Sequence, residues 1–196
     1  MPPVEDILRY LAGAWRMMNG KPDGLKAFDI SADGFWASFA AIPVALPALL
    51  AGWVVLANEL AQDPAIVGGR PSIIVRLALI DISSWLLPLA ALVALARPAG
   101  IADRLAHYVI ASNWGAALLV WGMLPFSLLL AGRQSEVATL LAIGLFVVTL
   151  VLSWRLTNVA IGKGPAVASA VFAAVLTASF AVLFTLQTAL GLSAPS

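Results

Sequence analysis

The sequence predicts an all-α integral membrane protein, a bundle of about five transmembrane helices preceded by an N-terminal amphipathic interfacial helix. The first observation is composition: 62% of the 196 residues are hydrophobic, 11% are charged, and the mean hydropathy is +0.98. Soluble domains have about a quarter of their residues charged. The second observation is that the apolar residues gather into runs about twenty long, the length that crosses a bilayer core about 30 Å thick.

Residues 1–34 are predicted to form a cytosolic or interfacial segment, made of an amphipathic helix and a polar connector. Pro2 and Pro3 come before the helix and Gly20 follows it, as expected at helix boundaries. One face of this helix carries apolar residues at helical spacing, namely Val4, Ile7, Leu8, Leu11, Trp15 and Met18. Three interpretations stay open: the helix lies in the membrane interface, docks on the protein's own cytosolic face, or recruits a partner.

Residues 35–196 are predicted to form the transmembrane domain, with spans at about 35–58, 72–96, 108–131, 137–154 and 166–192. In the last span small residues recur at every fourth position, namely Ala166, Ala170, Ala174 and Ala178. Such a ladder allows helices to approach closely, either within the bundle or between protomers.

The distribution of cations predicts the orientation. With five spans, the side that holds the N-terminus carries eight of the eleven Lys and Arg residues, namely Arg9, Arg16, Lys21, Lys26, Arg97, Arg104, Arg155 and Lys163. The other side holds Arg70, Arg76 and Arg133. The positive-inside rule therefore predicts a cytoplasmic N-terminus and a periplasmic C-terminus. Short loops and many Ala and Gly residues are typical of the prokaryotic inner membrane, where we expect the protein to reside.

Two charged residues lie inside the second span. Asp81 is near its middle, where a charge costs at least about 3 kcal/mol unless neighbouring groups satisfy it. Arg76 is close to the outer edge and is expected to extend outward, or to meet Glu59 or Asp63. Arg76 and Asp81 are about 140° apart around the helix, so they are not expected to pair with each other.

Asp81, Arg76, Ser84 and Asn113 are the candidate intramembrane polar site, and two interpretations of Asp81 compete. In the structural interpretation Asp81 is protonated, or hydrogen-bonded to Asn113, Thr177 or Ser179, and locks the bundle. In the functional interpretation it binds a proton or cation in a water-accessible cavity. We favour the structural interpretation, because the spans offer few companion polar groups.

The sequence argues against several function classes. The chain has no Cys and a single His, and it lacks HExxH, GxSxG and P-loop motifs, so no enzyme activity, metal site or cofactor is predicted. A net charge of +1 gives no field for nucleic acid.

The favoured function is that of a scaffold, accessory subunit or assembly factor of a membrane complex, in contact with lipid and with a membrane protein or a second copy of the chain. The alternative is a small transporter or channel subunit that works through Asp81. Transporter sites are built where helices break, and Pro43, Pro47, Pro88 and Pro125 could supply such breaks.

Overall fold

The structure is a computed structural model that describes residues 2–133 and 135–192, and within these ranges it is helical without a strand. The α-helices are α1 (Val4–Met18), α2 (Ala32–Ala37), α3 (Ala41–Leu60), α4 (Arg70–Leu95), α5 (Leu105–Leu130), α6 (Glu136–Ile161) and α7 (Pro165–Ala189). Short 3-10 segments are η1 (Pro22–Ala27), η2 (Ser38–Ala40) and η3 (Ala102–Arg104). Five segments are long and apolar enough to cross a membrane, so the prediction of five long apolar helices is confirmed.

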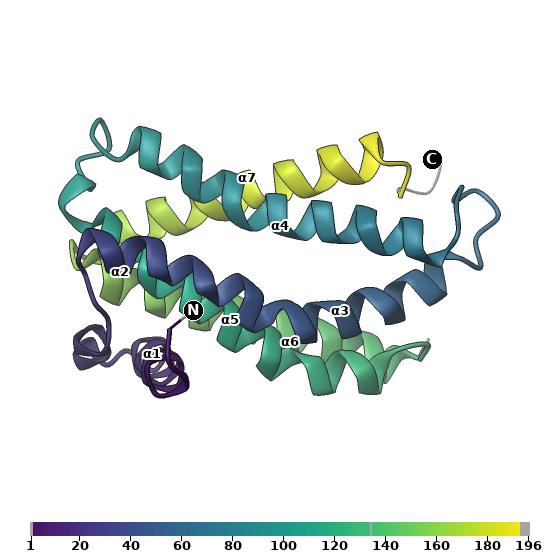
Figure 1. Cartoon of the computed structure of the whole chain (residues 1–196), viewed down its shortest axis with the longest axis horizontal. Coiled ribbons are helices and arrows are strands. Elements are labelled where there is room, and N and C mark those ends of the chain that lie inside the picture. The colour runs from purple at the N-terminus through teal and green to yellow at the C-terminus, as the bar shows by residue number, and fades with distance from the viewer. Residues whose placement is uncertain (1, 134, 193–196) are drawn as a thin grey trace.

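The five long helices form a closed ring. Along the ring α3 contacts α4, α4 contacts α7, α7 contacts α6, α6 contacts α5, and α5 returns to α3. They run roughly along the long axis of the molecule, and the chain reverses at each end (Figure 1). Buried apolar residues form two clusters, one shared with α1 and the other around Trp53, Ile73 and Ile80. The polar side chains that matter below therefore lie on the inner walls of a ring.

The first span is composite, because α2 and η2 lead into α3. The Ser31 side chain caps α2 by accepting a hydrogen bond of 3.0 Å from the Gly34 amide. In a continuous α-helix the ring of Pro43 would clash with the carbonyl of Phe39, four residues earlier. The chain forms the 3-10 segment Ser38–Ala40 at this place instead. Proline thus changes the helix type here, and Pro47 lies within α3.

The fourth span is longer than the sequence indicated. We predicted its end at Trp154, with a connector from Arg155 to Pro165, but α6 continues to Ile161. Nothing in this stretch breaks a helix until Gly162, which ends it in a left-handed conformation with φ of 60°. The predicted limit was set at Trp154, where an aromatic membrane boundary was expected, whereas the helix itself ends seven residues later.

The N-terminal helix α1 lies beside α5 and α6 near one end of the ring and is seen along its axis in Figure 1, where the long helices run horizontally. It contacts α5, α6 and η1, and Ala14, Met17 and Met18 are completely or almost completely buried. Gly13 and Gly24 allow close packing on η1, since a Cβ on Gly24 would lie 2.5 Å from the Gly13 carbonyl oxygen. One face of α1 is therefore docked on the bundle.

The alanine ladder of α7 does not face the bundle. Ala166, Ala170 and Ala174 are exposed and Ala178 is half-buried. Instead, α7 packs inward through Ala168 and Val171, which are buried. The ladder consequently lies mainly on the outer surface of the chain, which does not fit packing within the bundle and leaves packing between protomers as a prediction.

Candidate functional site

A cavity of about 480 Å³ lies inside the ring, with walls from α4, α5, α6 and α7. We call it the ring cavity. Its lining is mostly apolar, and its polar members are Asp81, Ser84, Tyr108, Ser112, Thr149, Ser153, Thr157 and Ser179, together with the indole of Trp85. At one end it reaches Met18 of α1. A cavity of this size falls in the range of small-molecule sites, about 300 to 1,000 Å³.

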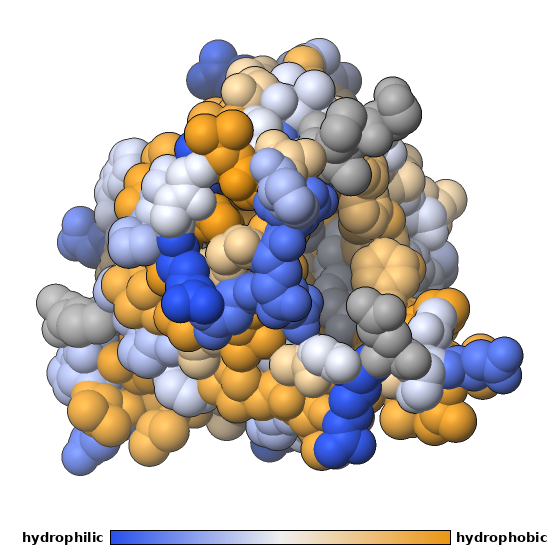
Figure 2. Space-filling view, turned by 90° about the vertical axis from the view of Figure 1, so that its right-hand side faces the viewer, coloured by the Kyte–Doolittle hydropathy of each residue, from blue (hydrophilic) through white to orange (hydrophobic). Residues whose placement is uncertain are grey.

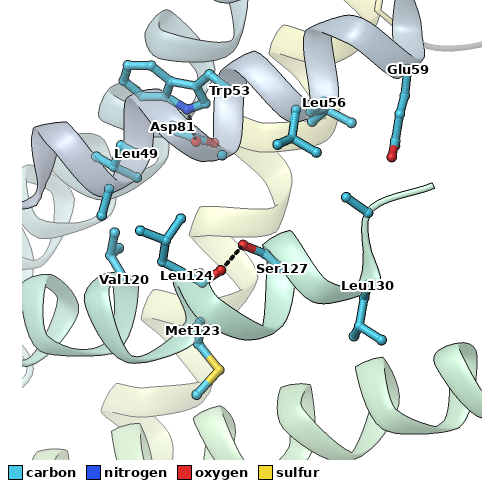
Figure 3. Close-up of a pocket in the computed structure, with 14 residues that line it drawn as sticks. Leu49, Trp53, Leu56, Glu59, Asp81, Val120, Met123, Leu124, Ser127 and Leu130 are labelled. Carbon is cyan, nitrogen blue, oxygen red and sulfur yellow. Dashed lines mark hydrogen bonds between the residues drawn. The ribbon is translucent and has the colours of Figure 1, made fainter. Parts of the chain in front are cut away.

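A second cavity of about 440 Å³ lies between α3 and α5, toward the end of the molecule that carries the C-terminus. We call it the α3–α5 cavity. Figure 3 shows Trp53 and Glu59 on one wall and Val120, Leu124 and Ser127 on the other. The two cavities share Leu49, Asp81 and Val120 in their linings. Asp81 therefore lies at the junction of the two cavities.

Asp81 is half-buried near the middle of α4, about 16 Å from the Arg70 end and about 21 Å from the Leu95 end at 1.5 Å per residue. Its Oδ2 accepts a hydrogen bond of 2.6 Å from Nε1 of Trp53 on α3 (Figure 3). Within the described residues, Asp81 forms no salt bridge to a Lys, Arg or His side chain. The carboxyl group therefore meets one neutral donor and no cation.

The hydrogen-bond partner of Asp81 differs from those that the sequence suggested. We expected Asn113, Thr177 or Ser179, but the bond is made by Trp53. The sequence analysis missed Trp53 because a Trp in an apolar span is usually interpreted as a hydrophobic core residue. The one available signal was that a buried Trp N–H usually needs an acceptor.

Ser84 lies one turn after Asp81 and lines the ring cavity with it. Its Oγ is buried and has no hydrogen-bond partner within the described residues. Residues three apart on a helix have Cβ atoms about 5 to 6 Å apart, so the two side chains are neighbours on one side of α4. Of the four residues of the candidate polar site, Asp81 and Ser84 therefore line the same cavity.

Asn113 belongs to a separate network. Its Oδ1 accepts from Nε1 of Trp85 over 3.0 Å, and its Nδ2 donates to Oγ of Ser38 over 2.9 Å. Ser38 in turn donates to the carbonyl of Phe35 over 2.7 Å. Because Asn113 is completely buried, these bonds tie α4, α5 and η2 together and fix the Trp85 indole at the cavity wall. The role of Asn113 at this site is to position Trp85.

Arg76 also lies away from Asp81. Its Nη1 donates to the carbonyl of Leu190, just past the end of α7, over 3.2 Å. The partners suggested by the sequence are used elsewhere: Glu59 accepts from the Gly132 amide, and Asp63 accepts from the Ala65 amide. A cation at a helix C-terminus is favourable, so Arg76 joins α4 to the end of α7.

In residues 2–133 and 135–192, no group of three or more His, Cys, Asp or Glu side chains could hold a metal ion. Comparisons of the chain with protein-family models, with curated proteins and with solved structures found no match. The function is therefore argued from the geometry of the two cavities and Asp81.

Proposed function

We propose that the chain is a small multi-pass membrane protein that acts as a transporter or channel subunit and binds a cationic solute at Asp81. The observation that carries this proposal is the position of the Asp81 carboxyl group at the junction of two cavities. Carboxyl groups at this depth in a membrane protein commonly mark the path of an ion or substrate.

Insertion into a membrane is supported by the outer surface of the ring. No more than 28% of the most apolar stretch of any long helix is buried, so most of these apolar residues are at least partly exposed. On α6 the exposed set includes Leu140, Leu141, Ile143 and Val147. Seen from the end that carries the C-terminus, hydrophobic residues extend around and between the hydrophilic ones (Figure 2). An apolar surface this large is suited to lipid rather than to water.

The distribution of cations supports one orientation in the membrane. The end of the ring that holds α1 also holds the α4–α5 and α6–α7 connections, and the opposite end holds the C-terminus (Figure 1). Eight of the eleven Lys and Arg residues belong to the α1 end. By the positive-inside rule we place that end in the cytoplasm and the C-terminal end in the periplasm, with the protein in the inner membrane.

We place α1 at the cytoplasmic membrane interface. Beside its docked face runs a strip formed by Val4, Leu8 and Trp15, which are 70%, 61% and 52% exposed. Trp36, near the start of the first span, is also highly exposed. An apolar strip on a helix near one end of the ring, together with exposed indoles, is typical of the membrane interface.

Two features favour a solute site over the structural role for Asp81 that the sequence favoured. An aspartate with a purely structural role is expected to be surrounded by polar groups that form hydrogen bonds with it. Asp81 instead borders two cavities. The buried Oγ of Ser84 is unpaired in the described structure, and a purely structural cluster would be expected to satisfy it. The position of Asp81 is explained if water or a solute occupies the ring cavity.

The second candidate function is the scaffold or accessory subunit. It is favoured by the outward ladder of Ala166, Ala170 and Ala174, because small side chains allow a helix of another membrane protein or a second copy to approach closely. In that case Asp81 would stabilise helix packing through its hydrogen bond and would not be accessible to water.

The chain contains no Cys, so single cysteines can be introduced without background. The test is modification of Ser84→Cys in membrane vesicles by a membrane-impermeant cationic methanethiosulfonate. Gln62→Cys in the exposed α3–α4 connection is the reactive control, and Leu141→Cys on the exposed apolar face of α6 is the unreactive one.

A water-accessible solute site predicts that Ser84→Cys reacts clearly faster than Leu141→Cys, and that Asp81→Asn slows the cationic reagent. Reaction of Ser84→Cys as slow as that of Leu141→Cys would contradict the proposal and favour the scaffold. Each variant is first shown to be folded by its elution as a single species in detergent.

A further inference from the structure

The ring cavity carries a single formal charge. Of its lining residues, Asp81 is the one carboxylic acid, and the lining contains no Lys, Arg or His. The α3–α5 cavity adds Glu59 and likewise contains no basic residue. A ligand that neutralises Asp81 in this low-dielectric setting must therefore bring its own positive charge.

The size and lining of the ring cavity favour an organic cation over a metal ion. Mg²⁺ and Ca²⁺ require about six or more oxygen ligands, whereas the cavity offers one carboxylate and scattered hydroxyls. Most of the wall is apolar, with Leu89, Leu119, Phe146 and Phe172 among its members. A cavity of about 480 Å³ has the volume of a small-molecule site, so it can hold an organic cation with an apolar body.

The free carboxyl oxygen of Asp81 narrows the head group of this cation. Trp53 occupies Oδ2 of Asp81, which leaves Oδ1 as an acceptor. An ammonium group can donate an N–H bond to this oxygen as well as bring the positive charge. A quaternary ammonium brings the charge but has no N–H to donate.

We infer that the ring cavity binds a protonated primary or secondary amine with an apolar body, whose ammonium group lies against the carboxyl group of Asp81. The Trp85 indole, held in place by Asn113, forms part of the wall that receives the apolar body. This inference rests on the proposed function and specifies the solute class for the same site.

The test uses three probes that share one apolar body and differ only in the head group: phenylbutylamine, phenylbutanol and phenylbutyl-trimethylammonium. Each is titrated calorimetrically into the full-length protein in lipid nanodiscs, with empty nanodiscs subtracted. The amine is expected to bind at least about thirtyfold more tightly than the alcohol. The reason is that the alcohol would leave the buried Asp81 carboxylate without a positively charged partner. The quaternary probe is expected to bind between the two.

Two variants locate the binding. Asp81→Asn should remove the preference for the amine over the alcohol, because it keeps the shape and gives up the charge. Ser83→Ala is the control, since Ser83 lies in α4 two residues after Asp81 but does not line the ring cavity, and it should leave all three affinities unchanged.

The inference is overturned if the alcohol binds as tightly as the amine, if none of the probes binds, or if Asp81→Asn leaves the amine preference intact. The comparison of amine with alcohol on the unmodified protein decides the matter even if Asp81→Asn does not fold. If Ser84→Cys is labelled by the aqueous reagent while the amine does not bind, the solute class is wrong and the proposed function stands. If labelling also fails, both fall.

Discussion

The indole Nε1 of Trp53 donates to Oδ2 of Asp81 over 2.6 Å, so that α3 holds the carboxyl group of α4 at the junction of the two cavities. The bond engages one of the two carboxyl oxygens. It also gives a reason for a Trp at this buried position of α3, since a buried indole N–H needs an acceptor. The same contact therefore contributes both to helix packing and to the orientation of the candidate site.

The first prediction concerns the energetics of this contact. Asp81→Asn keeps an oxygen acceptor for Trp53 and should fold with near-normal yield and thermal stability in detergent. Asp81→Leu leaves the Trp53 N–H unsatisfied and should cost about 1 to 3 kcal/mol. Adding Trp53→Phe to Asp81→Leu should recover part of this loss, with a coupling energy of about 0.5 to 3 kcal/mol. Strictly additive effects of the two changes would show that the bond is not formed.

The second prediction concerns the outer face of α7. Ala174→Leu should leave the thermal stability of the single chain in detergent unchanged, because Ala174 is exposed. Ala168→Leu is the matched comparison on the same helix and should destabilise by about 1 to 3 kcal/mol, because Ala168 is 0% exposed and the added volume must be accommodated. Equal losses for the two variants would place the ladder in a packed interface.

The third prediction is a pH dependence at the N-terminal helix. Arg16 of α1 donates two hydrogen bonds to the carboxylate of Asp23 in η1, and these bonds hold the pKa of Asp23 below its usual value. Because the folded-state pKa is lowered, this contribution to docking is present above about pH 4, the ordinary range of an Asp pKa, and is lost as the pH falls further. The effect should be small, since both side chains are exposed to solvent.

Hydrogen exchange of the α1 amides, corrected for intrinsic rates, measures this effect. Protection should fall as the pH is lowered below about 4 in the unmodified protein, and this acid-dependent step should be absent in Asp23→Asn. Asp6→Asn is the control, because Asp6 pairs with Arg9 inside α1 and not with η1. An identical acid profile for Asp23→Asn and the unmodified protein would assign the change to other groups.

Hydropathy could predict the five long helices and the mid-span position of Asp81, because both depend only on distance along the chain. It could not predict neighbours, because these spans are apolar around most of their circumference and their periodicity does not mark the inner face. The exposed Ala170 and the buried Ala168 illustrate this: both are small, and only the packing of the ring distinguishes them. The partner of Asp81 was missed for the same reason, since Trp53 becomes its neighbour only when α3 and α4 pack together.

The last prediction concerns Met18 of α1, which lines the ring cavity. Met18 is 1% exposed and packs against Gly115 of α5, where an added Cβ would come within 3.1 Å of its terminal methyl carbon. If this side chain closes the cavity, Met18→Ala should speed modification of Ser84→Cys by the impermeant reagent applied from the side of the membrane on which α1 lies. Application from the opposite side should give an unchanged rate.

Met17→Ala provides the matched control for this experiment. Met17 is adjacent, is 0% exposed and does not line the ring cavity. Truncation of either buried methionine is expected to cost about 2 to 5 kcal/mol, so a general loosening of α1 would accelerate labelling equally in both variants. Selective acceleration by Met18→Ala identifies Met18 as the inner closure of the cavity, whereas equal rates in the two variants would show that α1 docks without closing it.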